Sequence, residues 1–94
     1  ARRARRLGLL SEAVTEDELD STIDDIVTQI LKNGPVAVSQ AKALVQQVAN
    51  APINAELLDD TSKQIAKIRT SKEGQEGLGA FIEKRAPAWQ EKQA

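Results

Sequence analysis

Apolar residues recur at spacings of three and four along most of the chain, which is the period of a helix with one apolar face. The first clear stripe lies between residues 15 and 33. Its members are Leu19, Ile23, Ile26, Val27, Ile30 and Leu31. Polar and acidic residues fall mainly on the other side: Asp17, Asp20, Asp24, Asp25 and Gln29. We therefore predict an amphipathic helix that ends near Asn33.

The start and the end of this helix both have sequence signals. Thr15-Glu16-Asp17-Glu18 fits a capping box, in which the Thr15 hydroxyl accepts from the Glu18 N–H and the Glu18 carboxylate accepts from the Thr15 N–H. Asn33-Gly34-Pro35 predicts the end, with Gly34 able to take a positive φ and Pro35 unable to continue the helix.

Three more helices follow from the same kind of pattern. Pro35 suits a first helical position, and the short spacer before it predicts that the first two helices are antiparallel neighbours. The second helix has a stripe predicted to be buried, Ala37, Ala41, Leu44, Val45 and Val48. Asn54 is the expected N-cap of a third helix, with Leu57, Leu58, Ile65 and Ile68 on its apolar face.

The fourth helix is expected to begin at Thr70 or Ser71, where Thr70-Ser71-Lys72-Glu73 fits a second capping box. Its apolar stripe is Leu78, Phe81 and Ile82. It also contains Gly74, Gly77 and Gly79, which indicate either a frayed first turn or the close approach of another backbone or a ligand. Pro87 ends it.

These signals together predict an all-α fold with four main helices. Before them, Gly8 marks the end of a helix remnant and residues 11–14 form a short extended segment. After them, Trp89 lies in a charged tail, Gln90-Glu91-Lys92-Gln93. A ring of this size has a free-energy reason to dock, on this chain, on another subunit or on a ligand.

Composition excludes most active-site chemistry. The 94 residues include no His and no Cys, so the commonest general base, the thiol nucleophile and the commonest metal ligands are missing. No Asp or Glu stands in the apolar surroundings that raise a carboxyl pKa. We predict no catalytic residue and no metal site. There is also no Met, and we expect the chain to be part of a longer or processed protein.

Charge adds one alternative. The net charge is -1, but Arg2, Arg3, Arg5 and Arg6 concentrate positive charge at the start of the chain. Such a cluster can contact phosphates. No second basic patch and no stacking aromatics accompany it, so no nucleic-acid partner is expected. No apolar run is long enough to span a membrane and no signal peptide is present, which predicts a cytoplasmic protein without a membrane partner.

The C-terminal sequence carries a resemblance. SKEGQEGLGAFIEKRAPAW, residues 71–89, resembles the closing "EG…AF-x-EKR-x-P-x-W/F" pattern of the crotonase superfamily, the enoyl-CoA hydratase/isomerase family. Residues 4–14 resemble its "A…GLV-x-x-V" segment and residues 33–42 its "P-x-A…K" segment. The chain matches about the last third of a family member. Within the family, the sequence of this C-terminal stretch is most similar to members of the methylglutaconyl-CoA hydratase type.

The resemblance implies a parent enzyme that hydrates an enoyl-CoA thioester. In the family, a spiral of ββα turns supplies an oxyanion hole and catalytic acids, usually Glu, that stabilise and protonate an enolate. Residues 1–14 would be the end of that spiral core, and residues 15–94 the helical region that packs subunits and covers the acyl-CoA site. This region alone would be inactive, with no cofactor beyond the substrate thioester of the parent.

The resemblance also implies a coenzyme-binding role for Phe81 and Lys84, often toward a neighbouring subunit. They are three residues apart and therefore expected on one helix face, where a ring stacks on adenine and an ammonium meets phosphate. The alternative is that Phe81 belongs to the core and Lys84 is solvated. The implied partners are acyl-CoA and further copies, as a trimer or a dimer of trimers. A stand-alone helical interaction module is the competing function.

Overall fold

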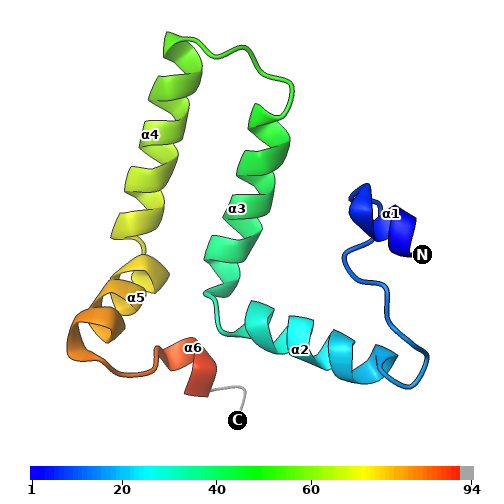
Figure 1. Ribbon diagram of the computed structural model, residues 1–94. Coiled ribbons are helices and arrows are strands. Elements are labelled where there is room, and N and C mark those ends of the chain that lie inside the picture. The colour runs from blue at the N-terminus through cyan, green and yellow to red at the C-terminus, as the bar shows by residue number, and fades with distance from the viewer. Residues whose placement is uncertain (92–94) are drawn as a thin grey trace.

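The computed structural model describes residues 1–91, and all regular elements in this range are helices (Figure 1). They are α1 (Arg2–Arg6), α2 (Leu19–Leu31), α3 (Pro35–Val48), α4 (Ala55–Thr70), α5 (Lys72–Glu83) and α6 (Ala88–Glu91). The all-α prediction is confirmed, with α2 to α5 as the four main helices and α1 as the N-terminal remnant. Lys92 and Gln93 of the expected charged tail lie outside the described residues.

The predicted end of the N-terminal helix remnant has the expected geometry. Gly8 follows α1 with a φ of +78°, and its N–H donates to the Arg5 carbonyl over 3.0 Å. The Leu9 N–H donates to the Ala4 carbonyl over 2.9 Å, which completes the bond pattern of a Schellman ending. Residues 11–14 then form neither helix nor strand.

The starts of α3, α4 and α5 also follow the sequence signals. Pro35 is the first residue of α3. The Asn54 side chain accepts from the Leu57 N–H over 2.9 Å at the start of α4. Ser71, rather than Thr70, caps α5, because its hydroxyl accepts from the Gly74 N–H over 3.1 Å.

The predicted capping box at Thr15 is only half correct. Glu18 accepts from the Thr15 N–H over 3.2 Å, as expected. The Thr15 hydroxyl, however, donates to the same carboxylate over 2.6 Å, and the Glu18 N–H donates to the Thr15 carbonyl over 3.2 Å instead of to the hydroxyl. The Glu18 carboxylate thus accepts hydrogen bonds from both the N–H and the hydroxyl of Thr15. Residues 16–18 form a turn, and α2 begins at Leu19.

Gly34 does not use the positive φ that a glycine allows. Its φ is -63° and its ψ is 128°, so the backbone is extended. A left-handed residue is not needed here, because the Asn33 side-chain amide donates to the carbonyls of Gln29 and Ile30 over 2.8 and 3.3 Å. These bonds satisfy acceptors that the end of α2 leaves open.

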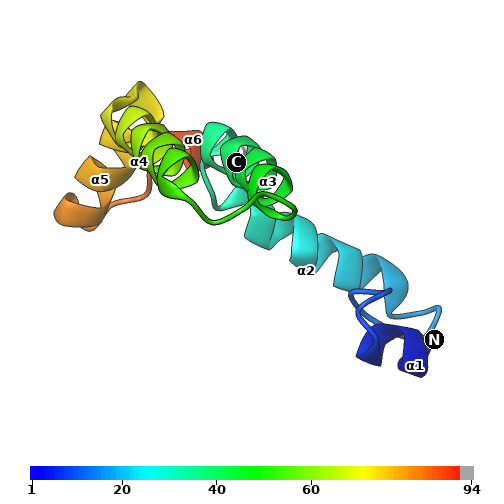
Figure 2. The ribbon, with the colours of Figure 1, turned by 90° about the horizontal axis from the view of Figure 1, so that it is seen from above.

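The helices form a flat, open arrangement. α3 and α4 run antiparallel side by side, and α5 packs against both (Figure 1). α2 instead runs across the end of α3 and carries α1 away from the rest (Figures 1 and 2). The predicted antiparallel pairing of α2 and α3 is therefore wrong. The extended backbone at Gly34 turns the chain away from α3 instead of folding it back along that helix.

Most apolar stripes remain open to solvent. The principal-axis extents are 44 × 40 × 17 Å and the radius of gyration is 17.4 Å, whereas a compact domain of this length has about 12 Å. Among residues 1–91, only Gly34 and Ala80 are buried. The prediction of a buried stripe on α3 is wrong: Val45, for example, is 65% exposed.

Close backbone approach, one of the two alternatives for the glycines of α5, is found at Gly74. A Cβ there would overlap the Ile68 carbonyl oxygen and lie 2.9 Å from the Arg69 carbonyl oxygen, both in α4. Without a side chain, Gly74 lets α5 turn directly out of α4. Gly77 faces the ring of Trp89, and only Gly79 has ordinary space around it.

Candidate functional site

The C-terminal end of α5 presents the residues for which the sequence suggested a binding role. Phe81 is 82% exposed and the adjacent Ile82 is 76% exposed. The alternative that Phe81 belongs to this chain's core is therefore wrong. An exposed aromatic ring beside an aliphatic side chain offers a flat apolar surface for another ring or an apolar partner.

Lys84 lies one residue beyond α5 and not on its face. It has a φ of 54° and a ψ of 41°, the left-handed conformation of a helix C-cap. The Arg85 N–H donates to the Ala80 carbonyl over 3.0 Å across this cap. The expectation that Phe81 and Lys84 share a helix face is thus replaced by a different geometry, in which both are exposed near the same helix end.

A bidentate ion pair fixes the chain just after this end. The Arg85 Nη1 and Nη2 atoms donate to the two Glu76 carboxylate oxygens over 2.6 and 3.0 Å, and Arg85 Nε donates to Glu83 over 2.6 Å. The Glu76 carboxylate also accepts from the Ala88 N–H over 2.9 Å. The Arg85 bonds, followed by the Ala88 bond, lower the pKa of Glu76 to about 2, and the pKa of Arg85 is raised.

Acidification is expected to release this anchor. The folded pKa of Glu76 is depressed, so its stabilisation is fully present above the ordinary value of 4.5 and is lost as the pH falls toward about 2. Trp89, the only tryptophan, follows Ala88 and reports the change. We expect its fluorescence emission to shift to the red within this window. Glu76→Gln should be red-shifted already at neutral pH and should lack this step; an unchanged titration in Glu76→Gln contradicts the assignment.

Trp89 docks on its own chain, which decides among the three partners left open by the sequence. Its indole N–H donates to the Lys32 carbonyl over 3.1 Å, and the Gln90 side-chain amide donates to the same oxygen over 2.8 Å. The ring lies over Gly77, 3.1 Å from the position that a Cβ would occupy. The C-terminal helix α6 is therefore attached to both α5 and the end of α2.

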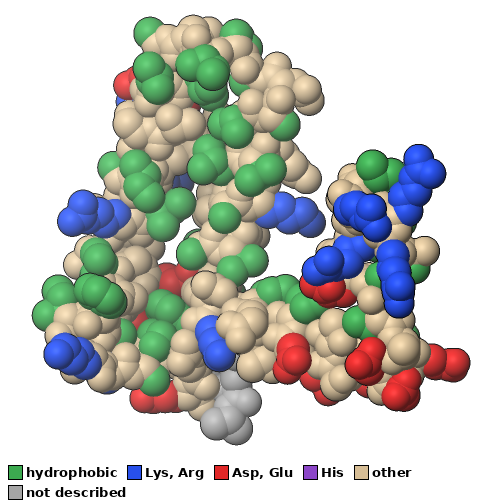
Figure 3. All heavy atoms as spheres, in the orientation of Figure 1, with side chains coloured by type: hydrophobic (Ala, Val, Ile, Leu, Met, Phe, Trp, Pro, Cys, Tyr) green, Lys and Arg blue, Asp and Glu red, His purple; other side chains and the backbone are tan. Residues whose placement is uncertain are grey.

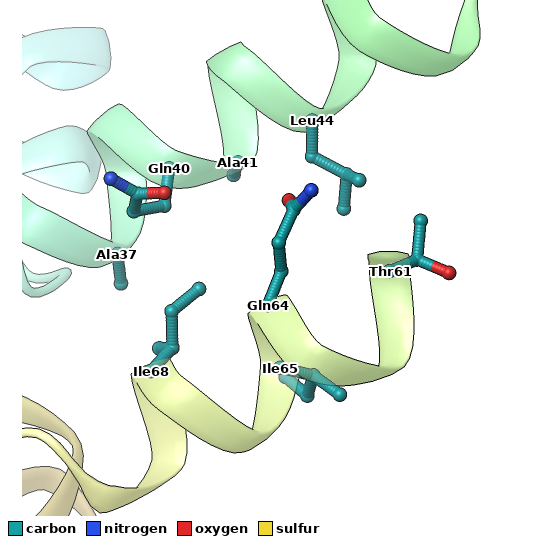
Figure 4. Close-up of a pocket in the computed structure, with 8 residues that line it drawn as sticks. All are labelled: Ala37, Gln40, Ala41, Leu44, Thr61, Gln64, Ile65 and Ile68. Carbon is teal, nitrogen blue, oxygen red and sulfur yellow. The ribbon is translucent and has the colours of Figure 1, made fainter. Parts of the chain in front are cut away.

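A second candidate surface is the groove between α3 and α4, with a volume of about 240 Å³ (Figure 4). It is lined by Ala37, Gln40, Ala41, Leu44, Thr61, Gln64, Ile65 and Ile68. None of these side chains is ionisable. The groove is suited to apolar side chains of a partner surface, and its lining holds no Asp, Glu, Lys or Arg side chain for acid or base chemistry.

Charge is segregated over the face shown in Figure 3. Basic side chains gather on α1, and acidic ones gather on α2 below it. Arg5 and Glu12 form an exposed ion pair with a distance of 2.7 Å. Exposed pairs of this kind stabilise little, so the segregation bears on partners more than on the fold.

Within residues 1–91, no group of three or more Asp or Glu side chains is arranged to hold a metal ion. No helix in the same range combines the length and the apolar character needed to cross a membrane. At the helix end near Phe81, the carboxylates of Glu76 and Glu83 both accept hydrogen bonds from Arg85.

The residues that organise this region were only partly visible in the sequence. Glu73 was assigned to a local capping box, but its carboxylate accepts from the Val36 and Ala37 N–H groups over 3.1 and 2.8 Å. The pair of Glu76 and Arg85 was not predicted. Its sequence signal is weak, because nine positions separate the two residues and a left-handed cap intervenes.

Comparison with known proteins identifies the class. The sequence profile of the enoyl-CoA hydratase/isomerase family matches residues 1–92, and the chain belongs to this family. The enoyl-CoA hydratase domain-containing protein 3, mitochondrial, of Rattus norvegicus is 36% identical over 94 residues, which cover 95% of this chain and 29% of that protein. The carnitinyl-CoA dehydratase of Salmonella typhi is 26% identical over 92 residues, 95% of this chain and 35% of that one.

Solved structures agree with this assignment. An enoyl-CoA hydratase/isomerase (crotonase) structure from Legionella pneumophila matches with a TM-score of 0.89 and 44% identity, over 95% of this chain and 34% of that chain. An enoyl-CoA hydratase structure from Shewanella pealeana matches with a TM-score of 0.86 and 38% identity, over 95% and 33%. The chain thus spans about a third of the length of its relatives.

The resemblance to the crotonase superfamily is confirmed by these matches. The finer likeness to methylglutaconyl-CoA hydratases stays a prediction. So does the cytoplasmic location, because one relative's name places that relative in mitochondria.

Proposed function

We propose that this chain is the helical C-terminal region of an enzyme that hydrates an enoyl-CoA thioester. In this proposal residues 1–14 end the spiral core, and residues 15–94 pack subunits together and cover part of the coenzyme A site. The chain alone is inactive. Membership of the enoyl-CoA hydratase/isomerase family and the match to about a third of each relative support this assignment.

The observation that carries the proposal is the large exposed surface. The chain exposes 8064 Å², whereas a compact monomer of 10.2 kDa exposes about 5,300 Å². The excess, about 2,800 Å², is larger than the roughly 800 Å² that one partner contributes to a standard interface. Much of the exposed area is apolar and lies on helix stripes. A surface of this extent fits a region that is covered by other parts of a larger assembly.

The chemistry of the proposed enzyme lies outside these residues. Addition of water to an enoyl thioester needs donors aimed at the thioester oxygen and an acid and base near the double bond. Residues 1–91 place no carboxylate in such a setting: Glu76, for instance, is held as an anion by Arg85. The proposal therefore gives this region binding and packing roles and no catalytic residue.

Phe81 and Lys84 are the residues proposed to meet coenzyme A. Both are exposed near the end of α5, and their chemistry suits an adenine ring and a phosphate. The left-handed cap at Lys84 turns the chain sharply after α5, and the Glu76–Arg85 pair holds the turn. This anchoring limits the conformational freedom that binding would otherwise have to restrict.

The test is steady-state kinetics of the complete enzyme with an enoyl-CoA substrate. Lys84→Asn removes the charge and keeps a residue that tolerates the left-handed cap. We expect the KM to rise about tenfold with little change in kcat, because a hydrogen bond to a charged group contributes roughly 1.5–3 kcal/mol. Phe81→Ala should act in the same direction. The matched control is Lys72→Ala, an exposed lysine at the other end of α5.

One observation distinguishes the proposed function from the competing one, a stand-alone helical interaction module. The coding sequence upstream of Ala1 should encode a spiral core if the proposal is correct. A start codon within a few residues of Ala1 would contradict it.

A KM that rises equally in Lys72→Ala would leave the enzyme assignment intact but would remove the specific role of Lys84.

A further inference from the structure

The chain turns from α2 into α3 at an elbow, defined here as residues 32–36. At both helix ends of this elbow, backbone groups form hydrogen bonds with side chains that are distant along the chain. On the α3 side, the Glu73 carboxylate accepts from the first free N–H groups, those of Val36 and Ala37. On the α2 side, the Lys32 carbonyl accepts from the side chains of Trp89 and Gln90. These partners lie 36 to 58 positions away along the chain.

The packing at the elbow leaves little room for another arrangement. Gly34 is one of the two buried residues in the described chain, and a Cβ there would lie 2.7 Å from Glu73 Cδ. On the other side, the ring of Trp89 rests on Gly77 of α5. The Glu76–Arg85 pair and the Ala88 N–H bond hold the segment that carries Trp89. α5 therefore contacts the elbow at the α3 end and α6 contacts it at the α2 end, while the Ala88 N–H bond to Glu76 holds α6 to α5.

We propose that residues 71–91 act as a clamp on this elbow, and that the clamp sets the direction in which α2 leaves α3. α2 is not among the closely packed helix pairs, which are α3–α4, α4–α5 and α3–α5. Its direction is therefore not fixed by packing along its length. The clamp is the device that positions the exposed apolar stripe of α2 relative to the α3–α4 pair.

This inference is independent of the enzymatic proposal, because it concerns only contacts within the chain. Two hydrogen bonds converge on the Lys32 carbonyl oxygen. Loss of one neutral hydrogen bond changes the ratio of chains with the clamp released to chains with the clamp formed by roughly two- to tenfold. Loss of both is expected to raise the population of other α2 directions by about tenfold. The helices themselves should persist, since their internal bonds are untouched.

The test is a distance measurement between spin labels in the full 94-residue chain, with doubly labelled chain diluted into an excess of unlabelled chain so that only distances within one copy are read. The chain has no Cys, so labels attach only at the introduced Asp24→Cys on α2 and Gln46→Cys on α3. We expect one narrow distance distribution with the natural clamp. Trp89→Phe combined with Gln90→Ala keeps an aromatic ring but removes both donors to Lys32. It should give a broad or second distribution at unchanged helical circular dichroism.

A second variant tests the other side. Gly34→Ala forces the Glu73 carboxylate away from the α3 N-terminus and should also broaden the distribution. Glu91→Gln, at the exposed last position of the clamp, leaves both donors to Lys32 and the Glu73 bonds in place and is the control. A distribution that stays narrow in the Trp89 and Gln90 double variant overturns the proposal. Equal broadening in Glu91→Gln also overturns it.

Discussion

Replacement of Gly74 by alanine is expected to destabilise the chain strongly, by roughly 1–3 kcal/mol or more in the free energy of unfolding. The added Cβ would overlap the Ile68 carbonyl oxygen and lie 2.9 Å from that of Arg69. Both atoms belong to the backbone of α4, so no side-chain rotation relieves the contact. α5 would have to move away from α4, which also displaces Glu73 from the N-terminus of α3. Thermal unfolding followed by circular dichroism measures the change.

Gly79 in the same helix provides the matched control. A Cβ there has as its nearest neighbour the Arg85 Nη2 atom at 3.8 Å, an ordinary contact with a flexible side chain. Gly79→Ala is therefore expected to stabilise the chain by roughly 0.5–1 kcal/mol through the better helix propensity of alanine. Opposite signs for the two substitutions are the expected result. Equal stabilisation by both would show that α4 and α5 do not approach closely at Gly74.

Local signals predicted the helices well, because the groups that define a helix end lie within a few residues of one another. The Asn54 cap, Pro35 at the start of α3 and Gly8 at the end of α1 are all of this kind. Where two neighbouring groups could form the same capping bond, the sequence did not decide which of them forms it. Ser71 rather than Thr70 caps α5, and Thr15 donates to Glu18 rather than accepting from it.

The arrangement of the helices was less predictable, because it depends on contacts between distant residues. The short spacer at Gly34 suggested an antiparallel pair, but Glu73 and Trp89 act on this elbow from the other end of the chain. Burial was overestimated for a similar reason. A periodic stripe shows that a helix face meets an apolar partner. It does not show that the partner lies within these 94 residues, and Val45 and Ile65 are 65% and 62% exposed.

The candidate site shows the same limit. Phe81 and Lys84 were named from the resemblance to the crotonase superfamily, and spacing placed them on one helix face. The structure places Lys84 in a left-handed cap instead. That conformation is unusual for a residue other than Gly, Asn or Asp, and no local sequence signal predicts it at Lys84. The Glu76–Arg85 pair that follows the cap is likewise a consequence of the turn and not of sequence spacing.

The 94-residue chain is expected to self-associate in solution because its apolar stripes are open. Members of the α2 stripe such as Ile23, Ile26 and Ile30 are 47%, 42% and 50% exposed. Burying them against another copy removes apolar area from water without a change in the fold of each copy. Sedimentation at increasing concentration should therefore show species larger than a monomer. A compact monomer at all concentrations would contradict the expectation.

The contribution of α2 is measured by replacing these three residues with glutamine. Each substitution lowers the favourable free energy of association by on the order of 1 kcal/mol or more, because less apolar surface is buried. The three together should weaken association about a hundredfold. The unfolding temperature of the monomer should change little, since 42–50% of each side chain is already exposed within it. Ser21→Gln, Asp25→Glu and Thr28→Gln on the opposite face keep the net charge and form the control. Equal weakening by the control would mean that association does not use the apolar stripe of α2.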